Sequence, residues 1–581
     1  MSSPAQRVLP GFKLGLSTTV TYLLLLVLIP LGMAVWKATD LSWSEFVAAV
    51  WNERAIAAYK LTFTAAFLSA AINVVLGLVV AWTLVRYRFP GRKMFDALVD
   101  VPFALPTAVA GLVYATLYVP NGWLGQFLVP LGFNGAYTQT GIVLVLVFTG
   151  FPFVVRAVQP VLEEIDQDTE QAAATLGANR WDVVRRVILP QLLPPALTGF
   201  TLAFARSVGE YGSVIFISAN KPFESEIAPV LIVSRLEAFA YREAAAIASV
   251  LLATSFIILI LINRLEQWSQ PGRAPVKLKF LETVAQWIDV PFGWVASRIP
   301  FAFSSWVSRH MPKLLILATV SLVTVLIVIP VVNVFAQAFA PGVVAYWHSL
   351  ADDPDTRHSI FLTAMIAPLA VAMNTAFGIA AAYTIARFRF RGRGLLISLI
   401  DLPFSVSPIV AGLVFVLLFG MSAPLGMWLK DHGYQILFAP PGLVLVTAFV
   451  TFPFVARELI PVLEANGPEE EIAARSLGAN AWQMFTRITL PNIKWGLIYG
   501  VLLCNARAMG EFGAIYVVSG RISGRTDTMP LRVEKLFQEY NQPAAFALAS
   551  VLTMLALVTL VLKVSVEGRL REVKKATEPE A

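Results

Sequence analysis

Hydrophobic positions along the chain form twelve long runs separated by shorter polar stretches. Each run holds about 20 mostly apolar residues, the length that an α-helix needs to cross the hydrocarbon core of a membrane. The pattern therefore predicts twelve transmembrane helices, near residues 17–37, 60–85, 98–118, 140–160, 192–216, 243–263, 313–337, 360–386, 397–420, 442–461, 493–518 and 544–564.

The predicted helices divide into two sets of six that repeat one another. Equivalent residues lie 301 positions apart, as in the pairs Asp100 and Asp401, Gly111 and Gly412, Arg206 and Arg507, and Glu210 and Glu511. Because each set has an even number of crossings, both copies have the same orientation in the membrane. The sequence therefore predicts an all-α polytopic membrane protein of two parallel six-helix repeats.

The two predicted repeats are residues 1–264, with a core at 60–264, and residues 313–581, with a core at 361–565. A linker at 265–312 joins them and carries basic residues beside tryptophans such as Trp287 and Trp294. This mixture favours a segment lying on the bilayer surface, and a tether with scattered aromatic residues is the alternative. In both cases the linker holds two halves in one polypeptide.

A polar stretch in each half has the signals of a helical hairpin: EQAAATLGANRWDVVRRVILP at 170–190 and EIAARSLGANAWQMFTRITLP at 471–491. Asp168 with Gln171 forms a capping-box pattern before the first stretch. The second opens with Gly467-Pro468 and three glutamates, which also favour a helix start.

The same two stretches each contain a predicted turn. Gly177 and Gly478 suit the left-handed cap that ends a helix, because glycine adopts that conformation without a steric penalty. Asn179 and Asn480 then favour the start of a second helix. Each stretch is therefore predicted to be a helix, a glycine turn and a helix.

The composition fits a membrane protein and excludes other classes. The chain is 57% hydrophobic and 14% charged, with a mean hydropathy of +0.71. It has one cysteine, Cys504, which excludes a disulfide or a cysteine metal site within the chain. The net charge of +7 does not indicate a nucleic-acid partner, because the basic residues cluster beside the apolar runs; the expected partner is the lipid bilayer.

Lysine and arginine predict the orientation. In the first half Arg7, Lys13, Arg86, Arg88, Arg92, Lys93, Arg156, Arg180, Arg185 and Arg186 fall on one side, against Lys37, Arg54, Lys221, Arg235 and Arg242 on the other. By the positive-inside rule, both chain termini and both polar hairpins are expected to be cytoplasmic.

No catalytic or metal motif is present in the sequence. A GxxxxGK[ST] phosphate loop is absent, and the four histidines (His310, His348, His358 and His432) form no metal-spaced pair. The chain is therefore expected not to be an enzyme and to bind no metal or cofactor.

The two polar hairpins resemble the EAA loop of ABC-transporter permeases. The resemblance rests on a glutamate, two alanines, a glycine and a Leu-Pro ending: Glu170, Ala172, Ala173, Gly177, Leu189 and Pro190 in the first, and Glu471, Ala473, Ala474, Gly478, Leu490 and Pro491 in the second. In that family the loop is cytoplasmic and docks into a groove on the ATPase. The resemblance implies two copies of an ABC ATPase, which bind the ATP and magnesium.

The hairpins depart from the family pattern at one position. The short motif has its glutamate directly before the alanines, whereas Gln171 and Ile472 intervene here. One extra residue turns the carboxylate by about 100° around the helix.

Two charged motifs fall within predicted membrane helices: ARSVGEYG at 205–212 and ARAMGEFG at 506–513. Charge at membrane depth costs a few kcal/mol or more, so such residues face a partner or a water-filled path. An ion pair between positions i and i+4 is one reading. In the other, one arginine per half lowers the barrier to an anion, and the candidate pathway residues are Arg206, Gly209, Glu210, Arg507, Gly510 and Glu511.

Other charges have simpler expected roles. Asp100 and Asp401 stand just before prolines and are expected to cap helix N-termini. Arg156 and Arg457 follow Phe-Pro-Phe and are expected to anchor at lipid headgroups.

Each half resembles a different subunit of the sulfate and thiosulfate permeases. LVDVPFALPTAVAGLV at 98–113 and FARSVGEYGSVIFIS at 204–218 resemble the CysT subunit, whereas LIDLPFSVSPIVAGLV at 399–414 and residues 490–520 resemble CysW. The resemblance implies a fused pair of type I ABC permease subunits in a bacterial inner membrane, importing sulfate or thiosulfate. It also implies a periplasmic or extracellular sulfate-binding protein that delivers the anion.

Three alternatives stay open from the residues alone. Molybdate and tungstate permeases share the ARxxGE(F/Y)G pattern, although they generally pair identical subunits. An ion-coupled carrier with twelve helices would need no structured hairpin. A membrane-embedded enzyme lacks a catalytic constellation here.

Overall fold

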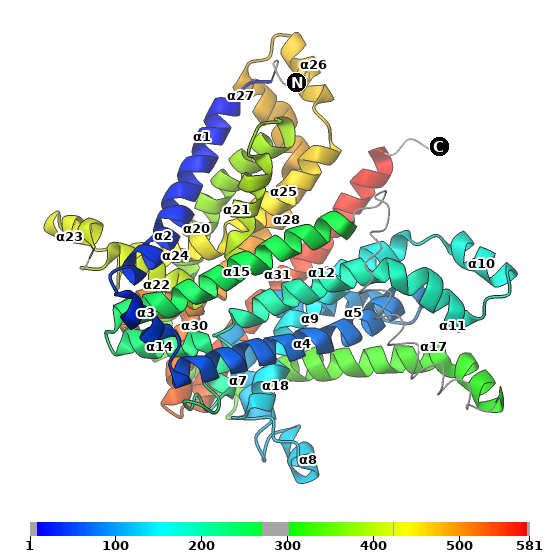
Figure 1. The fold of residues 1–581 in the computed structure, drawn as a ribbon, viewed down its shortest axis with the longest axis horizontal. Helices are drawn as coiled ribbons and strands as arrows, with labels where there is room; N and C mark the ends of the chain where they lie inside the picture. The colour runs from blue at the N-terminus through cyan, green and yellow to red at the C-terminus, as the bar shows by residue number, and fades with distance from the viewer. Residues whose placement is uncertain (1–8, 270–300, 422, 578–581) are drawn as a thin grey trace.

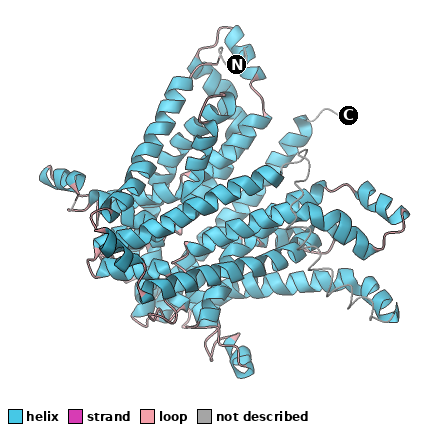
Figure 2. Ribbon diagram, in the orientation of Figure 1, coloured by secondary structure: helices cyan, strands magenta, loops and turns pink. Residues whose placement is uncertain are grey.

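The computed structural model describes residues 9–269, 301–421 and 423–577. Helices dominate these ranges, and no strand occurs within them (Figure 2). Of the predicted linker, 265–269 continue α15 and 301–312 begin α17, while 270–300 lie outside the described residues.

Within the described residues, nine helical stretches are long and apolar enough to cross a membrane, and three further pairs are bent at a short break. Counting each bent pair once confirms the twelve predicted crossings. Those of the first half are α1–η2–α2 (Phe12–Ala38), α4 (Glu53–Arg86), the bent pair Arg92–Ala104 with α7 (Thr107–Leu117), α9 (Gln139–Glu164), η4–α12 (Val184–Val208) and α15 (Tyr241–Ser269).

The second half repeats this order. Its crossings are α17–η5–α18 (Phe301–Phe339), α20 (Pro354–Arg387), α21 (Arg393–Ser405) with α22 (Pro408–Phe419), α24 (Pro440–Thr451) with α25 (Pro453–Ala465), α27–η6–α28 (Ala481–Met509) with α29 (Gly513–Ser519), and α31 (Gln542–Thr577).

The third crossing of each half is not the plain helix that its apolar run suggests. The chain turns by 106° after Ala104 in the first half and by 102° at the equivalent break in the second. Both breaks have two residues in extended conformation, Leu105-Pro106 and Val406-Ser407. A residue before proline avoids the α conformation, which accounts for Leu105 and Ser407. The break therefore has a local cause.

Four π-helical turns share one position relative to proline. They span Leu24–Leu28, Val184–Ile188, Thr324–Val328 and Phe485–Thr489, and each ends two residues before a proline. Proline has no N–H and its ring clashes with the carbonyl four residues earlier, so a widened turn relieves the clash. At Pro330 this carbonyl, Leu326 O, accepts the Tyr114 hydroxyl of the other half at 2.8 Å.

Figure 1 shows two helical bundles that meet at one end and diverge at the other. One bundle contains α20, α25 and α28 and ends at α26 (Glu469–Ser476), and the other contains α4, α9 and α12 and ends at α10 (Gln167–Thr175). We call the diverging end the hairpin side. The bundles meet where α14 (Ala228–Glu237) and α30 (Met529–Gln538) lie, and we call this end the loop side.

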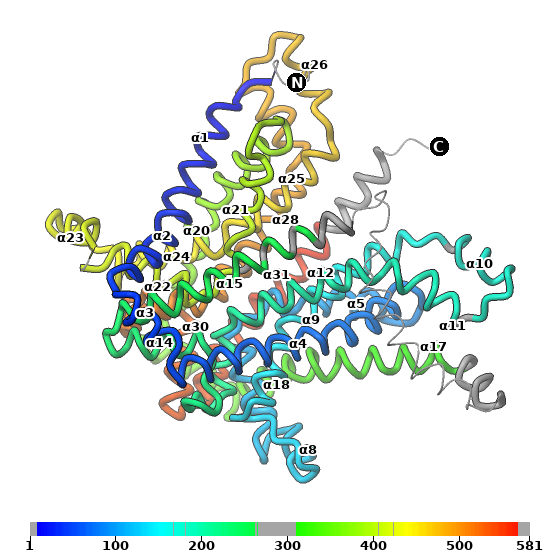
Figure 3. Tube along the Cα trace, in the orientation of Figure 1, coloured from blue at the N-terminus to red at the C-terminus, as the bar shows by residue number. Residues whose placement is uncertain are grey.

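The first crossing of each half packs on the opposite half. Helices α1 and α2 contact α20 and α22, while α17 and α18 contact α4 and α7. In Figure 3 the blue N-terminal trace of α1 runs beside the bundle that contains α20 and α25. The Tyr22 hydroxyl fixes this exchange by donating to Asn374 Oδ1 at 2.6 Å. The exchange makes the two halves one structure.

Candidate functional site at the seam between the halves

The predicted ion pairs are present near the ends of α12 and α28. Arg206 contacts Glu210 at 2.7 Å, and Arg507 contacts Glu511 at 2.9 Å. The glutamate side chains are 1% and 0% exposed, whereas the arginines keep 20% and 18% of their surface. Only the arginines can therefore reach a solute without a rearrangement.

The turn that follows each glutamate donates hydrogen bonds to its carboxylate. Glu210 Oε1 accepts from the backbone N–H and the hydroxyl of Ser213, both at 2.9 Å. Glu511 Oε1 accepts from the Ala514 N–H at 3.1 Å. Because charge-assisted hydrogen bonds are strong in a buried setting, they fix each carboxylate where it holds its arginine.

The glycines of the two motifs lie where the halves touch. A Cβ on Gly209 would stand 3.0 Å from Cα of Ser407, and a Cβ on Gly510 would stand 3.1 Å from Cα of Pro106. Ser407 also donates its hydroxyl to the Gly209 carbonyl at 3.0 Å. Each glycine thus meets the break in the other half's bent pair, and a larger residue would push the halves apart.

Aromatic rings at equivalent positions continue the seam. Tyr211 and Phe512 stack with centroids 6.0 Å apart and planes 16° apart, and Tyr516 meets Tyr211 edge-on at 5.3 Å. All three rings are buried. Arg206 and Arg507 therefore lie next to a closed aromatic contact between the halves.

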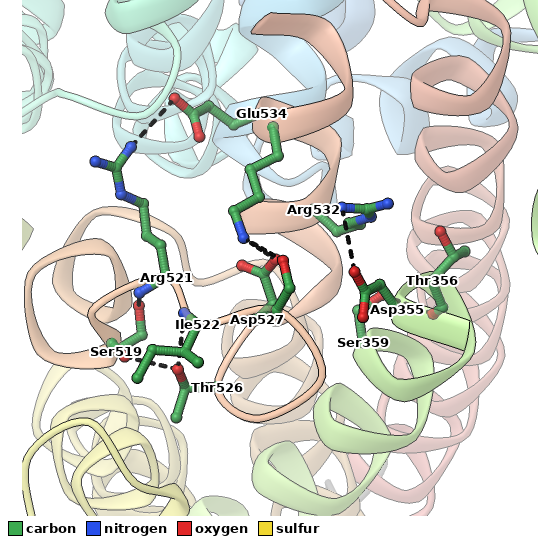
Figure 4. Close-up of polar contacts among 12 residues, drawn as sticks. Asp355, Thr356, Ser359, Ser519, Arg521, Ile522, Thr526, Asp527, Arg532 and Glu534 are labelled. Carbon is green, nitrogen blue, oxygen red and sulfur yellow. Dashed lines mark hydrogen bonds and ion pairs between the residues drawn. The ribbon is translucent and has the colours of Figure 1, made fainter. Parts of the chain in front are cut away.

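On the loop side the seam is spanned by a charged residue of the second half. Arg521 contacts Glu237 of the first half at 3.3 Å and Glu534 of its own half at 3.9 Å, and its guanidinium lies 4.5 Å from the centre of the Tyr516 ring. Figure 4 shows Arg521 and Glu534 pointing toward each other across this space. Arg521 therefore ties the two halves together at this end.

The first half lacks the equivalent charges. Val233 and Leu231 stand where the second half has Glu534 and Arg532. In the first half Arg54 pairs with Glu226 at 2.6 Å. Their counterparts in the second half, Asp355 and Asp527, are both acidic and lie near other cations. Asp527 contacts Lys535 at 2.8 Å, and Asp355 lies 4.0 Å from Arg532, whose closer partner is Asp353 at 2.7 Å. On the loop side the two halves thus have equivalent helices but different charged residues.

Two aspartates predicted as helix caps have another role. Asp100 makes no cap hydrogen bond; it accepts from Arg156 Nε at 2.7 Å and from Lys563 Nζ at 2.6 Å. Asp401 lies inside α21 and pairs with Arg457 at 2.6 Å. The cap prediction was wrong because these buried carboxylates pair with cations from other helices, and Lys563 links the second half to the first. The arginines expected at lipid headgroups are members of these pairs.

The glycine turns of the two hairpins are as predicted. Gly177 and Gly478 both have φ +88°. In each, the N–H after the glycine bonds the carbonyl five residues earlier, Ala178 to Ala173 and Ala479 to Ala474. The first helix begins two residues earlier than expected, because Asp166 rather than Asp168 caps α10 by accepting the Asp168 N–H at 2.9 Å.

The motif residues of the two hairpins fall into two groups by their solvent exposure. Glu170 pairs with Arg86, and Glu471, which is 2% exposed, pairs with Arg387 at 2.8 Å. These glutamates face the molecule. Ala172, Ala473, Pro190 and Pro491 are exposed, and Ala173, Ala474, Leu189 and Leu490 are half-buried. The glutamates thus fasten the hairpins, and the alanine face stays open.

The leucine before each turn glycine was not singled out from the sequence. Leu176 and Leu477 are 89% and 88% exposed, the most exposed leucines of the described chain, at the tip of each hairpin. Their repetition 301 positions apart was the signal that could have found them. Among the described residues, no three His, Cys, Asp or Glu side chains gather as a possible metal site.

A family model decides what kind of protein this is. The model described as "Binding-protein-dependent transport system inner membrane component" matches residues 73–274 and again 374–572. The chain belongs to this family. The two matches begin at equivalent positions of the two halves, so this inner membrane component contains the family's domain twice.

Curated relatives divide the chain in the same way. The sulfate transport system permease protein CysW of Escherichia coli (strain K12) is 51% identical over 255 residues, which are 44% of this chain and 87% of that protein. CysT of Salmonella typhimurium (strain LT2) is 48% identical over 272 residues, 47% of this chain and 98% of that protein. This supports the prediction that the permease is a fusion of a CysT-like and a CysW-like unit.

One solved structure is similar at lower identity. It is the crystal structure of a bacterial ABC transporter involved in the import of alginate, 17% identical, covering 46% of this chain and 98% of its own, with a TM-score of 0.39.

Removing the arginine from each hairpin ion pair, Arg387–Glu471 and Arg86–Glu170, is expected to destabilise the two hairpins to different degrees. Arg387→Ala leaves the buried Glu471 carboxylate without its cation, which costs roughly 3–5 kcal/mol in buried settings. Arg86→Ala acts on a more exposed pair and should cost less. We expect hydrogen–deuterium exchange to rise more in α26 of the first variant than in α10 of the second. Equal increases would contradict this account.

The buried Glu534 predicts a pH dependence. Burial raises the pKa of Glu534 from 4.5 to about 7, so between these values the folded chain keeps a proton that the unfolded chain has lost. The contribution of this proton to the free energy of unfolding is fully present below pH 4.5 and is lost as the pH rises through about 7. Glu534→Gln should therefore unfold at a higher temperature than the parent near pH 8 and lose most of this advantage near pH 5.

The control for the loss of one negative charge is Glu539→Gln, an exposed glutamate just after α30. An advantage of Glu534→Gln that stays constant with pH would mean that the carboxyl does not titrate in this window.

Proposed function

We propose that the chain is the membrane permease of an ATP-driven importer of sulfate or thiosulfate, and that it supplies both membrane subunits in one polypeptide. One observation carries the substrate assignment: two different sulfate permease proteins each match less than half of this chain over most of their own length. A molybdate or tungstate permease built from two identical subunits would not predict two dissimilar halves.

The hairpin side is proposed to be cytoplasmic, with both chain termini on that side. The excess of lysine and arginine beside the membrane helices supports this orientation. The described N-terminal segment fits it, because Leu9 packs with Met484 of the second hairpin. The loop side then faces outward, where a sulfate-binding protein would deliver the anion.

The two hairpins are proposed as the docking points for two copies of an ABC ATPase, which would bind and hydrolyse MgATP. Three features support this: the duplicated glycine turns, the open alanine face, and the exposed Leu176 and Leu477. A large apolar side chain held at a hairpin tip fits a hydrophobic pocket in a partner. The buried Arg387–Glu471 pair would transmit the partner's movement to α20.

Arg206 and Arg507 are proposed to attract the anion at the seam. Each keeps an exposed edge while its glutamate partner stays buried. A cation at membrane depth lowers the cost of bringing an oxyanion there. The arginine is already paired with a glutamate, so its net field is weak, which suits a pathway that must release the anion.

The shape of the molecule supports the proposed alternating access. The halves meet at the loop side and diverge at the hairpin side (Figure 1). ATPases that draw the hairpins together would pivot the rigid halves and separate the loop side. The contacts that must then open are Arg521–Glu237 and Tyr211–Phe512, which join residues of opposite halves.

Uptake of radiolabelled sulfate into vesicles tests the function. We expect uptake to require ATP, a sulfate-binding protein and the ATPase, and we expect the chain to rescue a sulfate-uptake mutant but not a molybdate-uptake mutant. Uptake that persists without the ATPase would reject the pump, and rescue of only the molybdate mutant would reject the substrate.

The pathway arginines predict a loss of transport without loss of assembly. Arg206→Ala and Arg507→Ala should each lower sulfate uptake, while ATPase binding stays at the parent level. Arg235→Ala, which removes an arginine from a loop-side ion pair with Glu243, is the control and should retain uptake. Parent-level uptake in both seam variants would leave the two arginines with a structural role only.

The hairpin tips predict a loss of ATPase binding. Leu176→Asp and Leu477→Asp should weaken binding of the ATPase to the purified permease, because a carboxylate cannot enter an apolar pocket without loss of hydration. Gly177→Val and Gly478→Val should do the same by straining the left-handed turn. Thr175→Asp is a matched polar control on the first hairpin. Full binding by all four hairpin variants would refute the docking role.

A further inference from the structure

Two segments project from the loop-side half of the molecule and are not used by the proposed transport path. The first wing, residues 119–138, contains α8 (Gly125–Leu128), and the second wing, residues 420–439, contains α23 (Pro424–Asp431). In Figure 1, α23 protrudes at the left and α8 at the bottom, away from the bundles and on either side of the region that contains α14 and α30. Each wing connects the third and fourth crossings of its half.

The wings are built into the fold at both ends. A Cβ on Gly125 would stand 1.9 Å from the Val119 carbonyl oxygen, and a Cβ on Gly426 would stand 2.1 Å from that of Gly420, so each wing folds tightly against its own start. At the other end the N–H groups of Tyr137 and Phe438 donate to the carbonyls of Ile217 and Val518, at 2.7 and 3.1 Å. The protrusions are therefore fixed shapes.

Both wings expose aromatic side chains at equivalent positions. Phe127 and Trp428 are 68% and 53% exposed, and Tyr137 and Phe438 are 48% and 40% exposed. Tyr137 and Phe438 have φ +57° and +58°, a conformation that side-chain-bearing residues rarely adopt. At this equivalent position in both halves, a strained backbone conformation thus coincides with an aromatic ring exposed at the surface.

Charge is nearly absent from these surfaces. The first wing has no lysine, arginine, aspartate or glutamate, and the second has only Lys430 and Asp431. Further exposed apolar residues are Trp123 and Leu131 in the first wing and Met421, Leu425 and Met427 in the second. An aqueous surface of this composition is unfavourable, whereas aromatic and apolar residues are enriched where a membrane meets water.

We propose that the two wings insert into the interfacial region of the lipid leaflet on the loop side and fix how deep and how tilted each half sits. A lipid surface fits better than a protein partner for two reasons. The wings project outward on either side of α14 and α30, whereas a single docking protein would span the seam between them (Figure 1). Their exposed aromatic and apolar side chains, with almost no charge among them, also match the interfacial region of a bilayer, where such residues are enriched.

An environment-sensitive fluorophore attached to introduced cysteines tests this. The only natural cysteine, Cys504, is buried, so a thiol label reaches only the new site. The test variants are Phe127→Cys and Trp428→Cys, with Leu131→Cys and Tyr434→Cys as second positions that are 81% and 63% exposed. Each labelled full chain is reconstituted in phosphatidylcholine–phosphatidylglycerol nanodiscs that carry headgroup-nitroxide lipids.

Two controls bracket the result. Glu224→Cys, whose parent side chain is 72% exposed on the loop side, reports water. Leu25→Cys, whose parent residue is 60% exposed on the first crossing, reports the hydrocarbon. We expect the wing labels to show blue-shifted emission and to lose most of their fluorescence to the headgroup nitroxide, more than either control.

Three outcomes would overturn the proposal. Emission and quenching equal to those at position 224, in either wing, would mean that the wing lies in water. Protection from an aqueous quencher that appears only when the binding protein is added would make the wings a protein-docking surface. Quenching in one wing alone would refute the claim that the duplicated geometry serves the membrane in both halves.

Discussion

The close approach of backbone to backbone at the seam is the constraint on which the rest of the structure depends. Gly209 meets Ser407 and Gly510 meets Pro106, so a glycine of each half fills the bend in the other half's third crossing. The bend requires a proline at each break, and the approach requires that the facing residue has no side chain. Arg206 and Arg507 stand one turn before these glycines, so the contact also sets where the two membrane charges lie.

Buried charges in the described residues lie beside opposite charges, but the pairing differs between the two halves. The seam pairs Arg206–Glu210 and Arg507–Glu511 are equivalent, whereas Asp100 takes a second cation, Lys563, from the opposite half. On the loop side, Arg521 and Glu534 have no charged equivalents in the first half. One polypeptide that always pairs the same two halves permits such one-sided contacts, because neither half ever meets a copy of itself.

Local sequence was enough to predict the features that depend on local physics. The twelve crossings, the repeat, and the turns at Gly177 and Gly478 follow from run length, spacing and glycine conformation. The cap at Asp166 was missed because Asp168 offers the same chemistry two residues later. The bends were missed although Pro106 and Pro408 signal them, since an apolar run of the right length reads as one helix.

Long-range partners were beyond the sequence. Asp100 and Lys563 are distant in the chain, and the packing of α31 against α6 (Val101–Ala104) brings them together. The exposure of Leu176, Leu477 and the wing aromatics was equally hidden, because a sequence pattern shows that a residue is apolar but not that the fold leaves it uncovered. These residues are where the chain has surface chemistry left for partners.

The central claim is that the halves are rigid bodies that pivot about the seam when ATPases close beneath the hairpins. A pulsed electron paramagnetic resonance distance between spin labels on Glu163→Cys and Glu464→Cys, exposed equivalent positions near the hairpin-side ends of α9 and α25, tests it directly. The account predicts a shorter distance when the complex with ATPase and binding protein is trapped with ATP than in the free permease. An unchanged distance in a complex that hydrolyses ATP and transports sulfate would contradict it.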